Sequence, residues 1–166
     1  MSEPHVIPIA LSLGSNTGDR LASLKNAVEA LAPYIEITAK SKIYETPPAY
    51  VSDQPAFLNA AVIGTTKLEP LALLWFLKDI ESEIGRLPTF RYGPRVIDID
   101  IVFYGDTILE TPELTLPHPR LAERDFVLRP LSDIAAAWKH PQSGKTVAEM
   151  LALLPDTNLP CIDASL

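Results

Sequence analysis

The chain has 166 residues, of which 47% are hydrophobic, so one domain with its own core is expected over residues 1–166. A formal net charge of −7 argues against a general nucleic-acid surface, and no apolar run reaches the ~18 residues that a membrane helix needs. Its one cysteine, Cys161, excludes a disulfide framework within the chain. The acidic start lacks the features of a signal peptide, which predicts a cytoplasmic protein.

The hydrophobic pattern predicts strands and helices that alternate along the chain. Four strands are expected, at Val6–Leu13, Ile35–Tyr44, Phe57–Thr66 and Val96–Tyr104. One helix follows a capping Asp19 and stops before Pro33, and a second runs from Pro70 to Gly85. The resulting order is βαββαβ. It predicts an α/β (α+β) fold with a ferredoxin-like core, in which a mostly antiparallel sheet is flanked by helices.

Loops and short helices complete the predicted organisation. Two long, stiff loops are expected at Thr46–Pro55 and Arg86–Pro94, because proline is excluded from central strands and helix interiors. Leu121–Arg124 is expected to form a short helix. Thr146 and Glu149 fit a capping box at the start of a last helix, which Pro155 ends.

Two carboxylates stand at alternate positions of the last predicted strand, in the stretch RYGPRVIDID. Residues two apart on a strand share a face, so Asp98 and Asp100 point one way while the isoleucines around them point into the core. A solvated face of an edge strand would explain a bare pair of this kind. Arginines and a Gly-Pro turn directly before the pair favour magnesium and a polyphosphate instead, since magnesium is bound by one or two carboxylates together with phosphate oxygens.

Arginine and histidine strengthen the polyphosphate interpretation. Six of the seven arginines lie between positions 86 and 129, and only Arg20 lies elsewhere. Surface ion pairs with nearby glutamates and aspartates remain the alternative, above all for Arg120 and Arg129. His118 stands between two prolines in LPHPR, which suits a residue that must hold its position, although a lone histidine is often structural.

Taken together, these stretches resemble the 6-hydroxymethyl-7,8-dihydropterin pyrophosphokinase family of folate biosynthesis. The resemblance covers residues 9–135 and rests on LSLGSN, YETPP, DQPAFLNAAV, I-E-x-x-x-G-R, GPRVIDIDI and LTLPHPRLAERDFVLRPL, in that order. It implies an ATP-dependent enzyme that transfers pyrophosphate to the hydroxymethyl group of the pterin and releases AMP. ATP and the pterin are then the expected partners, with no nucleic acid or membrane partner, and we expect a monomer.

The resemblance also implies roles for individual residues. Two Mg²⁺ ions are expected on Asp98 and Asp100, which count as catalytic together with Arg86, Arg91 and Arg95. The expected ATP-binding residues are Lys78, Glu81, Arg95, Ile101, Thr115, His118 and Arg124. The expected pterin-binding residues are Thr46, Pro47, Pro48, Phe57, Asn59, Tyr92, Asp98 and Phe126. The acceptor of the hydroxyl proton stays open between an aspartate and water.

The chain departs from the family pattern at two places. Leu87 and Pro88 follow Gly85-Arg86 where many members have a second arginine, so we expect Arg91 to contact the phosphates in its stead. The alternative, that Arg91 stays solvated like most surface arginines, remains open. Lys78 stands where the family has glutamine. Two other functions stay open at this point. One is another magnesium-dependent phosphoryl or nucleotidyl transferase, and the other is a non-enzymatic ferredoxin-like binding module.

Overall fold

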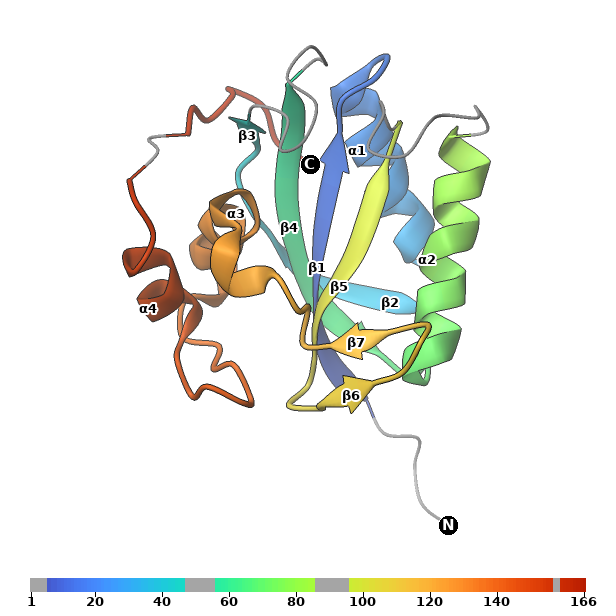
Figure 1. Ribbon diagram of the computed structural model, residues 1–166. Helices are drawn as coiled ribbons and strands as arrows, with labels where there is room; N and C mark the ends of the chain where they lie inside the picture. The colour runs from blue at the N-terminus through green and yellow to red at the C-terminus, as the bar shows by residue number, and fades with distance from the viewer. Residues whose placement is uncertain (1–5, 47–55, 86–95, 157–158) are drawn as a thin grey trace.

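The computed structural model describes residues 6–46, 56–85, 96–156 and 159–166. Its core contains β1 (Ile7–Ser15), α1 (Arg20–Leu31), β2 (Ile35–Lys40), β3 (Tyr44–Thr46), β4 (Phe57–Thr66), α2 (Pro70–Gly85) and β5 (Asp98–Tyr104). After β5 come β6 (Leu109–Glu110), β7 (Thr115–Leu116), the 3₁₀ helix η1 (Leu121–Glu123), α3 (Asp125–Ala135) and α4 (Val147–Ala152). Figure 1 shows how these elements surround the sheet.

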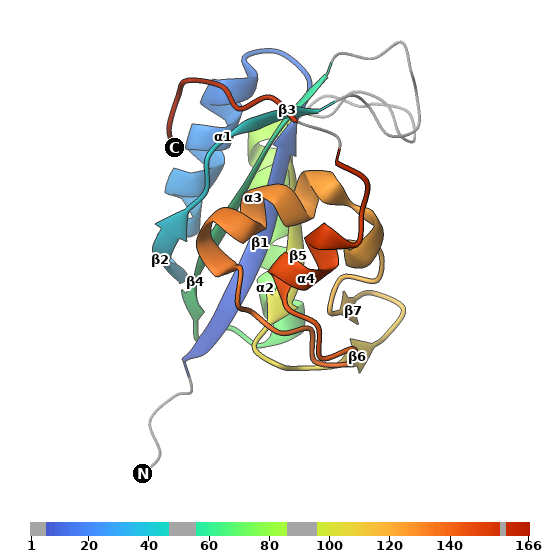
Figure 2. The ribbon, with the colours of Figure 1, turned by 90° about the vertical axis from the view of Figure 1, so that its left-hand side faces the viewer.

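The main sheet runs in the order β2-β4-β1-β5. Within this sheet, strand β4 pairs with both β2 and β3. Every pair in it is antiparallel. The predicted ferredoxin-like arrangement is therefore confirmed. Helices α1 and α2 cover one face of the sheet, and α3 and α4 cover the other (Figures 1 and 2).

Each face of the sheet has its own apolar cluster. Leu11, Leu24 and Leu77 belong to the cluster under α1 and α2. Phe103 and Leu128 belong to the cluster under α3 and α4. Alternation along β5 sends its residues to both clusters, and the register shift against β1 at Ala10/Leu11 places two neighbours, Val102 and Phe103, in the same cluster. The two layers fix β5 from both sides, which matters because β5 carries the two aspartates.

Local sequence signals explain most element boundaries. The Asp19 carboxylate accepts a hydrogen bond from the Ala22 amide at 3.0 Å and caps α1 as predicted. The expected strand Phe57–Thr66 is confirmed, and both bonds of the Thr146–Glu149 capping box are present. Within the described ranges, no helix is both long and apolar enough to cross a membrane.

Two expectations about secondary structure were wrong or incomplete. The single strand expected at Ile35–Tyr44 is split into β2 and β3, because the Lys42 amide between them donates to Asp133 on α3. Helix α3 was not predicted beyond η1, because Pro130 lies inside it and proline normally ends a helical pattern.

Candidate active site

The two aspartates of β5 share the face of the sheet that lies toward α3. Ile97, Ile99 and Ile101 are each 4% exposed, whereas Asp98 is half-buried and Asp100 is exposed. The predicted alternation of buried isoleucine and accessible carboxylate is therefore confirmed. Two carboxylates on one face repel each other, so the site is suited to a bound cation.

A row of directly opposed residues crosses the sheet at this level. Tyr44 on β3 pairs with Asn59 on β4, Asn59 with Gly14 on β1, and Gly14 with Asp98 on β5. Directly opposed residues of antiparallel strands have their side chains on the same face. With strands ~4.8 Å apart, Asn59 and Asp98 are about 10 Å apart across the row. Gly14 has no side chain and is buried, and the Asn59 amide and the Phe57 ring lie next to the position that a side chain there would take. A flat ligand between the amide and the carboxylate would lie against these two groups.

Asn59 is held in a defined orientation. Asn59 is only 5% exposed, and its Nδ2 donates a hydrogen bond of 2.5 Å to the Thr46 hydroxyl. A Cβ added at Gly14 would lie 2.9 Å from the Asn59 Oδ1 and 3.4 Å from the Phe57 ring. The structure thus brings together three residues of the predicted pterin site around Gly14, namely Thr46, Phe57 and Asn59.

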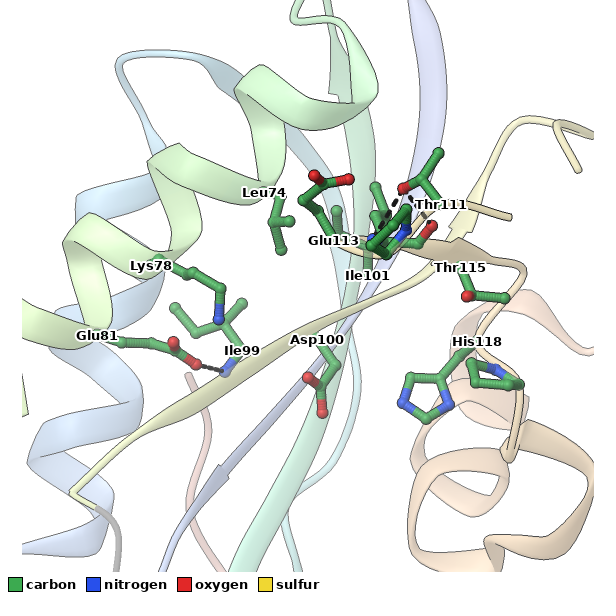
Figure 3. Close-up of a pocket in the computed structure, with 13 residues that line it drawn as sticks. Leu74, Lys78, Glu81, Ile99, Asp100, Ile101, Thr111, Glu113, Thr115 and His118 are labelled. Carbon is green, nitrogen blue, oxygen red and sulfur yellow. Dashed lines mark hydrogen bonds between the residues drawn. The ribbon is translucent and has the colours of Figure 1, made fainter. Parts of the chain in front are cut away.

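A cavity of about 290 Å³ lies beside Asp100, between α2, β5 and the segment after β6 (Figure 3). Leu74, Ile101 and Leu114 supply apolar walls. Polar groups come from the predicted ATP-binding residues Lys78, Glu81, Thr115 and His118. The lining thus combines apolar walls with several convergent polar side chains, which suits a polar small molecule.

His118 is held by two backbone contacts at the edge of this cavity. Its amide donates to the Val102 carbonyl of β5 at 3.0 Å, and its Nδ1 accepts from the Arg120 amide at 3.2 Å. Burial lowers the pKa of His118 from its ordinary value, and nearby Asp100 opposes that change. Because Nδ1 is an acceptor, the neutral ring carries its proton on Nε2 and can donate from there.

Glu81 links α2 to the aspartate strand. Its carboxylate accepts a hydrogen bond of 2.7 Å from the Ile99 amide, drawn as a dashed line in Figure 3. Burial raises the pKa of Glu81 to about 7, the Ile99 bond opposes this, and Asp98 adds to it. The position of Glu81 therefore fixes the part of β5 that lies between the two carboxylates.

Arg124 and Phe126 lie together at the start of α3. The Arg124 guanidinium carbon lies 5.5 Å from the centroid of the Phe126 ring, within the range of a cation–π contact. Phe126 packs against the apolar cluster under α3, which is on the same side of the sheet as Asn59 and Asp98. One short segment thus carries a candidate phosphate ligand and a candidate ring-stacking partner.

Other predicted residues are in segments outside the described part of the chain. These are Pro47, Pro48, Arg86, Arg91, Tyr92 and Arg95. Both expected long loops, apart from Thr46, are in the same segments. In the described ranges, no group of three or more His, Cys, Asp or Glu side chains forms a metal site, so a cation here would rest on the aspartate pair and on a ligand's oxygens.

The surface alternative holds for two arginines. Arg120 pairs with Glu123 at 3.8 Å, and Arg129 pairs with Asp156 at 3.7 Å, both with at least one well-exposed partner. Sequence reasoning missed Gly14 in the row across the sheet. It also missed some residues that line the cavity, namely Leu74, Thr111, Pro112, Glu113 and Leu114. Strands β6 and β7 have two residues each and give no periodic signal, whereas the alternation around β1 could have drawn attention to Gly14.

Known proteins with similar sequences point to one family. The family model described as 7,8-dihydro-6-hydroxymethylpterin-pyrophosphokinase (HPPK) matches residues 10–136. A Methylorubrum extorquens protein named 2-amino-4-hydroxy-6-hydroxymethyldihydropteridine pyrophosphokinase is 44% identical over 155 residues, which cover 92% of this chain and 97% of that protein. A protein of the same name from Aquifex aeolicus is 40% identical over 85% of this chain and 88% of its own length.

Longer proteins also match. The folic acid synthesis protein FOL1 of Dictyostelium discoideum is 45% identical over 89% of this chain, which corresponds to 22% of that protein. The chain spans between 20% and 28% of the length of six such curated relatives. A crystal structure of Plasmodium falciparum HPPK-DHPS with pteroate has the same fold, with a TM-score of 0.73 at 18% identity over 92% of this chain and 43% of that one. On the family model and the relatives of similar length, the chain belongs to the 7,8-dihydro-6-hydroxymethylpterin-pyrophosphokinase family.

Proposed function

We propose that the chain transfers the pyrophosphoryl group of ATP to the hydroxymethyl group of 6-hydroxymethyl-7,8-dihydropterin, as a step in folate biosynthesis. The observation that carries this proposal is the row across the sheet, in which the Asn59 amide and the Asp98 carboxylate flank the surface over Gly14, which has no side chain of its own. Family membership makes the pterin the natural occupant of that surface.

The pterin would lie over Gly14 with its ring edge toward Asn59. A pterin edge has both donors and acceptors, and a carboxamide offers one of each kind. Phe57 is at the end of β4 beside Gly14, and Phe126 is on the same side of the sheet. Two aromatic side chains suit a flat heteroaromatic ring, since offset stacking adds to the burial of its faces.

The nucleotide would occupy the cavity beside Asp100. Its apolar walls suit a base, while Lys78 and Thr115 offer polar contacts to the ribose or phosphates. His118 contributes an N–H donor from Nε2, and Arg124 a guanidinium that matches phosphate oxygens. Arg86, Arg91 and Arg95 are proposed for the same phosphates from the preceding loop.

Magnesium fits the donor set of this site, and we propose two ions on Asp98 and Asp100. Both side chains are accessible and lie two residues apart on one face of β5. Magnesium when bound supplies positive charge that neutralises the phosphate oxygens. Glu81 holds the Ile99 amide between the two aspartates, so the carboxylates stay on a fixed strand.

In the transfer, the hydroxymethyl oxygen of the pterin forms a bond to the β-phosphorus of ATP. The bond from that phosphorus to the oxygen bridging the α- and β-phosphates breaks, AMP leaves, and the hydroxyl proton is released. The chain's residues contribute position and charge to this step rather than a covalent nucleophile.

The test incubates the protein with ATP, magnesium and each of several hydroxyl acceptors and separates the nucleotide products. We expect AMP that depends on both magnesium and 6-hydroxymethyl-7,8-dihydropterin. Release of ADP, or turnover with the other acceptors but not with the pterin, would assign a different phosphoryl transferase. No turnover with the pterin would support a binding module.

A further inference from the structure

Arg20 is the arginine that stands apart from all the others in the sequence, and the structure gives it two partners. Its Nη1 donates a hydrogen bond of 2.8 Å to the Ala56 carbonyl and lies 2.9 Å from the Glu45 carboxylate. Arg20 is the first residue of α1, Glu45 is the middle residue of β3, and Ala56 directly precedes β4. One guanidinium nitrogen therefore joins the middle of β3 to the residue that precedes β4.

The joined strands carry the proposed pterin contacts. The last pair between β3 and β4 is Thr46 with Phe57, and the Asn59 amide donates to the Thr46 hydroxyl. Glu45 pairs with Leu58, which belongs to the apolar cluster under α1 and α2. Side chains alternate along a strand, so Arg20 holds Glu45 on one face while Thr46 points to the other.

Strand β3 has three residues and needs external support, because so short a strand offers few ladder bonds. Its first residue, Tyr44, donates from its hydroxyl to Asp133 on α3 at 2.9 Å. The amide of its middle residue, Glu45, donates to the Pro160 carbonyl at 2.9 Å. Pro160 belongs to the C-terminal segment, which runs beside β3 in Figure 2. These contacts hold the backbone at the beginning and middle of β3, and Arg20 adds a side-chain contact at Glu45, next to Thr46.

We propose that Arg20 is a positioning residue for pterin recognition, acting through Glu45 and Ala56 on Thr46, Phe57 and Asn59 from the opposite face of the sheet. This inference rests on the proposed function, because it takes those three residues as the pterin contacts. The Arg20 and Glu45 side chains are 30% and 40% exposed, so their attraction is partly screened by water. The Ala56 bond to a charged donor is the stronger contact.

The experiment compares Arg20→Met, Arg20→Lys, Glu45→Gln and the double variant Arg20→Met/Glu45→Gln. Calorimetry measures the binding of 6-hydroxymethylpterin and, separately, of an ATP analogue with a methylene group between the α- and β-phosphorus. Lys25→Met is the control, since it removes an exposed cation from the same helix.

We expect Arg20→Met to raise the Kd of the pterin about tenfold, which corresponds to about 1.4 kcal/mol, with the Kd of the ATP analogue unchanged within twofold. Arg20→Lys should restore part of the affinity. The double variant should lose less than the product of the two single losses, because Arg20 and Glu45 act on one contact. Lys25→Met should match the wild type.

An unchanged pterin Kd in Arg20→Met, or equal loss of both ligands, would overturn the role of Arg20. Hydrogen exchange of the unliganded proteins separates this outcome from failure of the proposed function. Arg20→Met should exchange faster than Lys25→Met in peptides covering Glu45–Thr46 and Ala56–Asn59. If the wild type binds no pterin, the proposed function and this role of Arg20 fail together, even where the exchange difference shows that Arg20 stabilises the two strand segments.

Discussion

Gly14→Ala tests whether the surface over Gly14, between Asn59 and Asp98, is the pterin site. The added Cβ would lie 2.9 Å from the Asn59 Oδ1, closer than such atoms approach in real structures, so the amide must move. Turning it off its rotamer costs about 0.5–1.5 kcal/mol. Losing its bond to Thr46 costs about 0.5–1.5 kcal/mol more.

The sum of about 1–3 kcal/mol sets the expected loss of pterin affinity. A ligand that needs the original amide position binds in proportion to the fraction of protein that has it. The Kd of 6-hydroxymethylpterin should therefore rise about 5- to 150-fold, while the Kd of an unreactive ATP analogue should stay the same. Calorimetric titration of each ligand measures both values.

Gly64→Ala is the matched control, because it is the same substitution at a buried strand glycine of β4 that lies away from Asn59 and Asp98. A Cβ there would meet the Glu36 backbone carbonyl, so the variant should lower the free energy of unfolding without favouring one ligand over the other. Wild-type pterin affinity in Gly14→Ala, or an equal loss for both ligands in the two variants, would refute the assignment of the surface over Gly14.

Three further predictions concern the metal, the aromatic residues and the buried carboxyl group. Asp98→Asn or Asp100→Asn should lower turnover on the order of a thousandfold at saturating magnesium, without loss of folding stability because repulsion is relieved; near-normal turnover would contradict the metal site. Phe57→Ala and Phe126→Ala should weaken pterin binding much more than ATP binding in paired titrations. A larger loss of ATP affinity would show that the pterin does not stack between these two rings. The pKa of Glu81 is raised from its ordinary value of 4.5 to about 7. The stabilising contribution of this carboxyl group is therefore complete below pH 4.5 and is lost as the pH rises through 7. Urea unfolding without ligands measures the free energy of unfolding of Glu81→Gln and of the wild type. The difference between them should grow in favour of Glu81→Gln from pH 4.5 to pH 8, by about 1–2 kcal/mol after allowance for partial exposure. A difference that does not change with pH would count against this pKa.

The fold was predictable because its main elements carry strong local signals. The alternation in β5 and the cap at Asp19 are short-range features, and each was read from a few neighbouring residues. The split between β2 and β3 depends on a bond from the Lys42 amide to Asp133, 91 residues later in the sequence. A contact of that separation leaves no periodic trace in the sequence.

The candidate site shows the same division. Asp98, Asp100 and His118 stand in motifs, so the sequence could nominate them. Gly14 gains its meaning only from the register that sets it between Asn59 and Asp98. The sequence showed only that Arg20 stands apart from the other arginines, because its partners are distant in the chain, with Glu45 on β3 and Ala56 just before β4.

The most direct test of the proposed function follows individual phosphorus atoms of ATP into the products. Two reactions contain magnesium, 6-hydroxymethyl-7,8-dihydropterin and ATP that is radiolabelled at either the α- or the β-phosphorus. Pyrophosphoryl transfer predicts that the β-label moves to the pterin and the α-label stays in AMP. An α-label on the pterin would indicate nucleotidyl transfer, and a β-label retained in ADP would indicate transfer of the γ-phosphoryl group alone; either result would contradict the proposed function.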